Sequence, residues 1–161
     1  MLRGAAAAVA VLAVVATAAC GGSDGAPAGT SDEASLTVRD DGSGGVTVQA
    51  TWVTPAHLEA RDDLQEIAAS YAGRDVALVH VKLDTHSVDL SNVDLAAQAE
   101  LDVGATSQRP LAYHALSGEG HHVDGVLVFE APSPGATTAL VVRDVAGVPV
   151  RRLAWAALPS D

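Results

Sequence analysis

The chain has 161 residues, enough for one domain and a tail, with 9 Lys and Arg against 20 Asp and Glu and a formal net charge of −11. Its 1 cysteine cannot pair within the chain, which excludes a small protein held together by disulfides. The acidic balance excludes the usual nucleic-acid binder, because phosphate contacts need a basic face. The length also argues against a multi-domain enzyme.

The first residues predict an export signal. Arg3 provides a positively charged start, and residues 4–19 form an uncharged, Ala-rich apolar run. This run is shorter than the ~20 strongly apolar residues of a typical membrane-spanning helix. It fits the apolar region of a secretory signal followed by small residues, so residues 1–19 are predicted to be a signal peptide.

The only cysteine, Cys20, follows this run directly. Residues 17–20 read Thr-Ala-Ala-Cys and are followed by two glycines, which resembles the lipobox of bacterial lipoproteins. That family prefers an aliphatic residue where Thr17 stands. The resemblance implies that Cys20 is acylated, becomes the first mature residue and anchors an extracytoplasmic protein to the cell membrane. The alternative is an ordinary secreted protein cleaved near Ala19, with an incidental cysteine.

Residues 20–45 are rich in Gly, Ser, Asp and Pro, and predict a flexible acidic linker because large apolar residues are too few to offset the entropy of ordering. From Val46 onward, alternating apolar residues and turn residues recur at short spacing. They predict an all-β fold over residues 46–158, an immunoglobulin-like antiparallel sandwich of about seven strands. Trp52 and Trp155 are the expected core anchors. The expected strands are 46–52, 76–83, 98–103, 110–116, 123–130, 137–145 and 148–155.

One segment, residues 55–73, breaks this pattern and predicts a short inserted helix. Thr54 is a suitable N-cap, Pro55 suits the first helical position and Gly73 fits the exit. We expect the helix to lie across one open end of the sandwich and to cover the core. Its apolar residues fall on one stripe, which consists of Leu58, Leu64, Ile67, Ala68 and Tyr71.

Histidines are the only chemical signal in the sequence, and there are 6 of them. His80 is expected to be a surface residue beside Lys82, because alternation along residues 76–83 gives the core face to its neighbours. Asp84 and His86 share its outward face. His121 and His122 follow a Gly-Glu-Gly turn, whose irregular backbone can let two adjacent rings converge.

The loop that carries His86 and the loop that carries His121 and His122 would form a transition-metal site if they lie side by side in the fold. Neutral imidazole suits copper or zinc, and a nearby carboxylate can bind the metal or orient a ring. The expected site consists of His86, His121 and His122, with Asp84 or Glu119 in support. The alternative is that the histidines are structural and hydrogen-bond to local backbone. A pH-sensitive contact or another ligand is a further option.

These two segments resemble an uncharacterised group of secreted prokaryotic β-sandwich domains. Members of the group carry a D-T-H-S segment, matched by residues 84–87, and a G-H-H-x-x-G-x-L-x-F segment, matched by residues 120–129. The resemblance covers about the middle third of the chain. It implies either a shared site or a shared structural device, and residues 55–73 would be an addition to the fold of the group.

No residue pattern predicts an enzyme. Ser117 lies outside a G-x-S-x-G elbow, and no Gly-rich loop opens a helix. The sequence therefore predicts a non-enzymatic binding module anchored to the membrane through Cys20, in its sharper form a transition-metal binder. The alternatives are a structural or protein-interaction module of the cell envelope, with the histidines as loop braces, and an accessory factor of a membrane complex.

Overall fold

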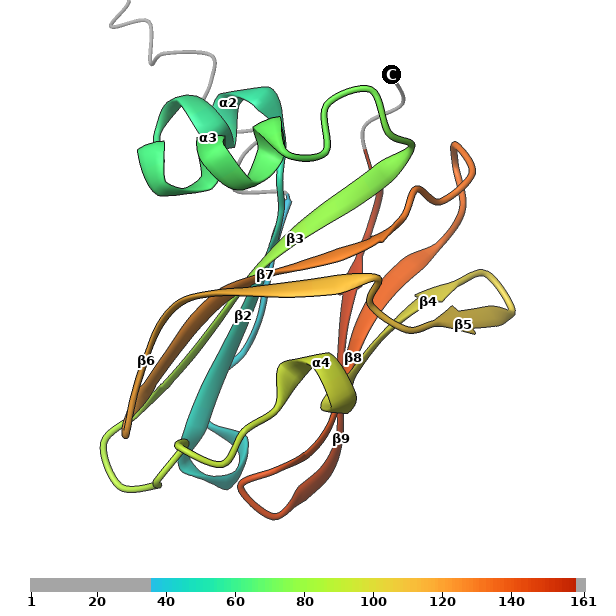
Figure 1. Ribbon diagram of the computed structural model, residues 1–161. Helices are drawn as coiled ribbons and strands as arrows, with labels where there is room; N and C mark the ends of the chain where they lie inside the picture. Colours follow the sequence, from blue (N-terminus) through green and yellow to red (C-terminus); the bar gives the residue numbers. More distant parts are fainter. Residues whose placement is uncertain (1–35, 159–161) are drawn as a thin grey trace, which may run out of the picture.

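The computed structural model of the protein describes residues 36–158. The predicted signal peptide, Cys20 and residues 20–35 of the predicted linker lie outside the described residues. Two antiparallel sheets pack face to face (Figure 1), which confirms the predicted all-β sandwich. One sheet has the strand order β1-β2-β3-β7-β6 and the other has the order β5-β4-β8-β9.

All the predicted strands are present, and two short strands are additional. The five-stranded sheet contains β1 (Thr37–Asp40), β2 (Val46–Trp52), β3 (Val76–Thr85), β6 (Ala112–Glu119) and β7 (His122–Glu130). The four-stranded sheet contains β4 (Ala99–Val103), β5 (Thr106–Gln108), β8 (Thr138–Val145) and β9 (Val148–Trp155). The additional strands are β1 and β5.

The core lies between the two sheets and is built by strand alternation. Each strand sends every second side chain inward, so Val48 of β2, Val81 of β3 and Leu140 of β8 are fully buried. Trp52 and Trp155 meet edge to face with ring centroids 5.5 Å apart, as expected of core anchors. The indole of Trp155 also donates from Nε1 to the Leu36 carbonyl oxygen at 2.8 Å.

Residues from Leu36 onward belong to the folded domain, which corrects the predicted end of the linker at residue 45. β1 pairs with β2 along its whole length, and Leu36 is buried. The chain reverses between these strands through the 3-10 turn η1 (Ser43–Gly45), where Gly42, Gly44 and Gly45 adopt positive φ. The glycines that resemble a linker in composition therefore form a tight turn, because they tolerate this backbone conformation.

The inserted segment forms two short helices rather than one, α2 (Pro55–Glu59) and α3 (Asp62–Ala69). Thr54 caps α2 as predicted, since its side-chain oxygen accepts from the His57 amide at 3.3 Å. The chain turns extended at Arg61, with φ of −141°, which separates the helices. A third helix, α4 (Leu95–Gln98), lies between β3 and β4. None of the helices within residues 36–158 is long and apolar enough to cross a membrane.

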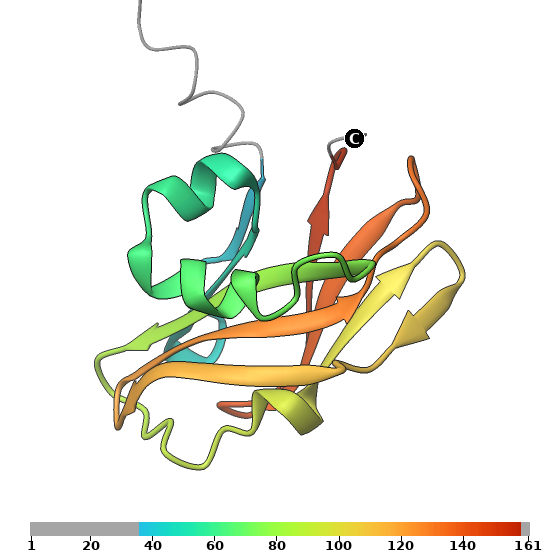
Figure 2. The ribbon, with the colours of Figure 1, turned by 45° about the horizontal axis from the view of Figure 1, so that its top comes forward.

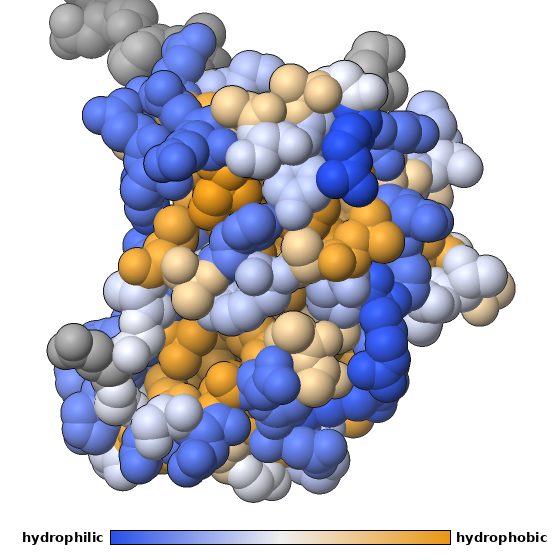
Figure 3. Space-filling view, viewed as in Figure 1, coloured by the Kyte–Doolittle hydropathy of each residue, from blue (hydrophilic) through white to orange (hydrophobic). Residues whose placement is uncertain are grey.

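The helix pair lies against the outer face of the five-stranded sheet, which corrects the predicted position across an open end. In Figures 1 and 2, α2 and α3 lie on the side of this sheet that faces away from the four-stranded sheet. Side-chain contacts join the pair to β3, β6 and β7. Figure 3 shows mostly hydrophilic residues on the outer surface of the helix pair. Under the pair, His80, Val126 and Val128 are buried, whereas Asp84 and His122 farther along the same face stay exposed.

Candidate functional site

The two segments that carry the predicted metal ligands lie side by side. The amide of Thr85, at the end of β3, donates to the carbonyl oxygen of His121 at 3.1 Å. The amide of Leu90 donates to the carbonyl oxygen of Gly120 at 2.6 Å. Gly120 adopts a positive φ of 52° in the turn that joins β6 to β7. These contacts lie at the end of the sandwich opposite Leu36, because β2 pairs Val46 with Thr85 at that end.

The rings of the histidine doublet point to different partners. His121 donates from Nδ1 to the carbonyl oxygen of Val88 at 2.9 Å. His122 donates from Nδ1 to the Asp84 carboxylate at 2.8 Å, across the β3–β7 pair. The two adjacent rings therefore bind different partners, one a loop carbonyl and the other a facing carboxylate.

The predicted metal ligands are thus only partly brought together. Asp84 pairs with His122, while His121 binds a backbone oxygen and His86 is exposed. Within residues 36–158, no three His, Cys, Asp or Glu side chains are grouped so as to hold a metal ion. The side chain of Glu119 lies outside the described part of the chain. The His122 and Asp84 side chains are 63% and 56% exposed, so their ion pair contributes less than about 1 kcal/mol.

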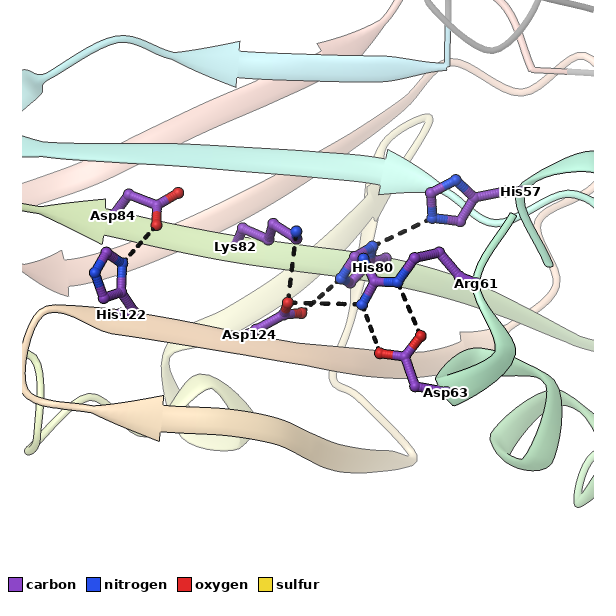
Figure 4. Close-up of polar contacts among 8 residues, drawn as sticks. All are labelled: His57, Arg61, Asp63, His80, Lys82, Asp84, His122 and Asp124. Carbon is purple, nitrogen blue, oxygen red and sulfur yellow. Dashed lines mark hydrogen bonds and ion pairs between the residues drawn. The ribbon is translucent and has the colours of Figure 1, made fainter. Parts of the chain in front are cut away.

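A second polar group on the same sheet face was missed by the sequence reasoning (Figure 4). It consists of His57, Arg61, Asp63, His80, Lys82 and Asp124, here called the His80 cluster. His80 is only 3% exposed, which corrects its predicted place on the surface. The alternation argument is right about direction, since His80 faces away from the main core. It fails on burial, because the helix pair covers that face.

His80 occupies the centre of this cluster. It donates from Nε2 to the Asp124 carboxylate at 2.6 Å, and its Nδ1 lies 3.2 Å from Nε2 of His57. Burial lowers the pKa of His80, while the hydrogen bond to Asp124 and the charge of Asp124 act in the opposite direction. A neutral His80 that donates from Nε2 must accept at Nδ1, so the donor of the second hydrogen bond is His57.

Charged side chains surround the two rings. Asp124 lies 3.6 Å from the Lys82 ammonium and 3.7 Å from the Arg61 guanidinium. Arg61 also donates to both carboxylate oxygens of Asp63, at 2.8 and 2.6 Å. This hydrogen bond raises the pKa of Arg61 and lowers the pKa of Asp63. With neutral rings the cluster carries two positive and two negative charges, and is balanced.

The side chains of the His80 cluster can bind and release protons, but the cluster contains no hydroxyl or thiol that could act as a nucleophile. Asp124 and His80 are arranged like the carboxylate and the imidazole of a hydrolase triad, in which the free ring nitrogen activates a hydroxyl or thiol. Here that nitrogen binds a second imidazole instead. A cavity of about 300 Å³ lies nearby at the end of the sandwich, but its lining is mainly apolar and includes Trp52, Leu58 and Pro132. The cluster and the cavity are therefore separate features.

Two signals in the sequence could have revealed this cluster. Val126 and Val128 stand at outward-facing positions of β7, where a solvent-exposed face would carry polar residues. The inserted segment also brings an amphipathic stripe that needs a surface to cover. Together they indicate that the helices lie on the face that carries His80.

Comparison with protein-family models, with curated proteins and with solved structures found no match to this chain.

Proposed function

We propose that this protein is an extracytoplasmic, non-enzymatic binding module of the cell envelope, anchored to the membrane by acylation of Cys20. Its partner is an envelope protein, and the contact surface is the end of the sandwich opposite Leu36. His121 and His122 serve as braces that hold the loops at this end.

The direction of the two rings carries this proposal. His121 is bound to the Val88 carbonyl and ties the β6–β7 turn to the continuation of β3, while His122 binds Asp84 across the paired ends of β7 and β3. Preformed loops lose less conformational entropy when they bind a partner. The chain before Leu36 joins the fold beside Trp52, at the other end of β2. A tether attached there leaves the braced end free to face away from the membrane.

A transition-metal site remains the second candidate, and the contact between the two histidine-bearing segments favours it. Copper or zinc would be held by His86, His121 and His122 with Asp84 in support. The histidines could keep their present partners, because each ring of the doublet donates from Nδ1 and would bind the metal through Nε2.

Metal titration beside a double variant separates the two candidates. The bracing proposal expects the parent protein to bind Cu²⁺ or Zn²⁺ no more tightly than the His121→Ala, His122→Ala variant. It also expects the variant to melt lower without metal, by roughly 3–8 °C, because one backbone and one carboxylate hydrogen bond are lost. Isothermal calorimetry and thermal unfolding measure the two effects.

His86→Ala is the matched control, because the His86 side chain is exposed and makes no hydrogen bond or ion pair within residues 36–158. Bracing expects this variant to keep the parent melting temperature and metal response. If the parent binds metal at least tenfold more tightly than both variants, the bracing proposal fails and the metal candidate takes its place.

The anchoring part of the proposal has its own experiment. Cys20→Ser removes the thiol to which acyl chains are attached, so the protein should move from the membrane fraction to the soluble extracytoplasmic fraction. Cell fractionation with immunodetection measures the distribution, and a membrane-embedded lipoprotein serves as the reference. A variant that stays in the membrane fraction would contradict acylation as the anchor.

A further inference from the structure

The helix pair covers an apolar patch that is separate from the main core. Val126 and Val128 of β7 are buried, yet they point away from the core residues Leu127 and Phe129. Leu64 of α3 is buried as well and also lies outside the main core. The outer face of the five-stranded sheet therefore has a second, smaller apolar layer, which depends on α2 and α3 for its cover.

Polar contacts join this cover to the sheet at three places. His57 of α2 meets His80 of β3 at 3.2 Å. Arg61, between the helices, lies 3.7 Å from Asp124 of β7. The Tyr71 hydroxyl, after α3, lies 2.8 Å from Nε2 of His114 on β6. The first two contacts share one cluster, as Figure 4 shows, so a change in its charge acts on both.

The contact between the two imidazoles tolerates one added proton but not two. When both rings are neutral, His57 donates to Nδ1 of His80. With one more proton, Nδ1 of His80 can donate to His57 while Nε2 still donates to Asp124. With a second proton, both facing nitrogens carry hydrogen and no acceptor remains. Two positively charged rings then lie close to the positive charges of Arg61 and Lys82. The His80 cluster contains two carboxylates to compensate, and one of them, Asp63, is already bound by Arg61.

The contact between Tyr71 and His114 responds differently. A hydroxyl can donate to a neutral ring or accept from a protonated one, so this hydrogen bond survives protonation of His114. The acid-sensitive contact is therefore the one between His57 and His80.

We propose that the α2–α3 segment is an acid-released cover, held closed by the His57–His80 contact and detached from β3 and β7 when both rings are protonated. Detachment exposes Val126, Val128 and Leu64 while the main core between the sheets stays folded. The burial of His80 determines how the closed state depends on pH. Because burial lowers the pKa of His80 in the closed state, the ring binds a proton more readily once the segment has opened. The closed state is therefore most stable above about pH 6.5 and loses stability as the pH falls below that value.

Hydrogen–deuterium exchange of the purified full chain tests the proposal. Between about pH 7.5 and about pH 5, after correction for intrinsic exchange, the amides of residues 55–69 should lose at least tenfold in protection. The amides of β2 and β8 should keep theirs. In His57→Gln the new amide can donate to a neutral His80 or accept from a protonated one and takes up no proton itself, so most of the loss should disappear over this pH range. Protection that does not change with pH, or an equal loss in His57→Gln, would overturn the proposal.

His114→Gln is the control, because it alters a contact between the cover and the sheet without touching the imidazole pair. It should keep the midpoint of the parent. If His57→Gln is already unprotected at about pH 7.5, an NMR titration of the parent decides the matter. Uptake of the second proton by the pair must coincide with the loss of protection. Independent titration of His57 and His80 while the segment stays protected would refute the acid-released cover.

Discussion

At the scale of single residues, the Arg151 side chain connects three parts of the fold. It is 2% exposed, donates from Nη1 to the Val145 carbonyl oxygen at 2.7 Å and donates from Nη2 to the Ser43 carbonyl oxygen at 2.6 Å. Its Nε lies 3.3 Å from the Asp40 carboxylate. Burial lowers the pKa of Arg151, and the charge of Asp40 opposes that shift. The guanidinium remains charged and connects β9, the end of β8 and η1.

Arg151→Lys should destabilise the sandwich although it keeps the charge. An ammonium cannot reach two carbonyls and a carboxylate in the fixed geometry of the guanidinium fork, so at least one buried acceptor loses its donor. We expect a loss of about 2–4 kcal/mol in the free energy of unfolding, measured by urea denaturation. Arg152→Lys is the control, because Arg152 is exposed and pairs with Asp102 on the surface. Its effect should stay within about 0.5 kcal/mol, and equal losses in both variants would contradict the role of Arg151.

At the scale of elements, alternation predicted the strands well because it reports the main core. Residues 46–52 and 148–155 are strands with the expected bounds, and the other predicted strands differ from the observed ones by a few residues. The same reasoning allows a brief strand at residues 36–38 but leaves it outside the folded domain, since the glycines at 42, 44 and 45 give a tight turn the composition of a linker. A linker and a tight turn of the same composition differ in whether the flanking segments pair, as β1 and β2 do here, and local composition does not report that pairing.

The candidate site illustrates a different limit of sequence reasoning. The segments that carry His86 and the doublet were correctly grouped, yet the direction of each ring depends on which neighbour offers an acceptor. His121 finds the Val88 carbonyl and His122 finds Asp84. His80 was assigned to solvent because outward direction was equated with exposure. The inserted helix pair covers His80, so an outward-facing residue is buried here. The position of the helices depends on tertiary packing, which local periodicity does not encode.

At the scale of the whole molecule, the two ends of the sandwich differ in character. Leu36, Trp52 and Trp155 gather at one end, where the N-terminal segment joins the fold and the helix pair lies. The segments that carry His86, His121 and His122 lie at the other end. The acid-sensitive cover and the proposed contact surface are therefore at opposite ends of one sheet face. β3 connects them, since it carries His80, Lys82 and Asp84 in a single outward row.

The start of the folded unit can be tested with two shortened chains. A chain that begins at Leu36 should melt within about 2 °C of the full protein, whereas one that begins at Val46 should melt roughly 10 °C lower or more. The second chain lacks β1, which leaves the Trp155 indole without its acceptor and Arg151 without Ser43 and Asp40. It also loses the buried Leu36 side chain, and each such loss costs about 1–3 kcal/mol. Differential scanning calorimetry measures both melting temperatures. If the two shortened chains have the same melting temperature, β1 lies outside the cooperatively folding unit. The domain boundary would then be at Val46, as the composition suggests.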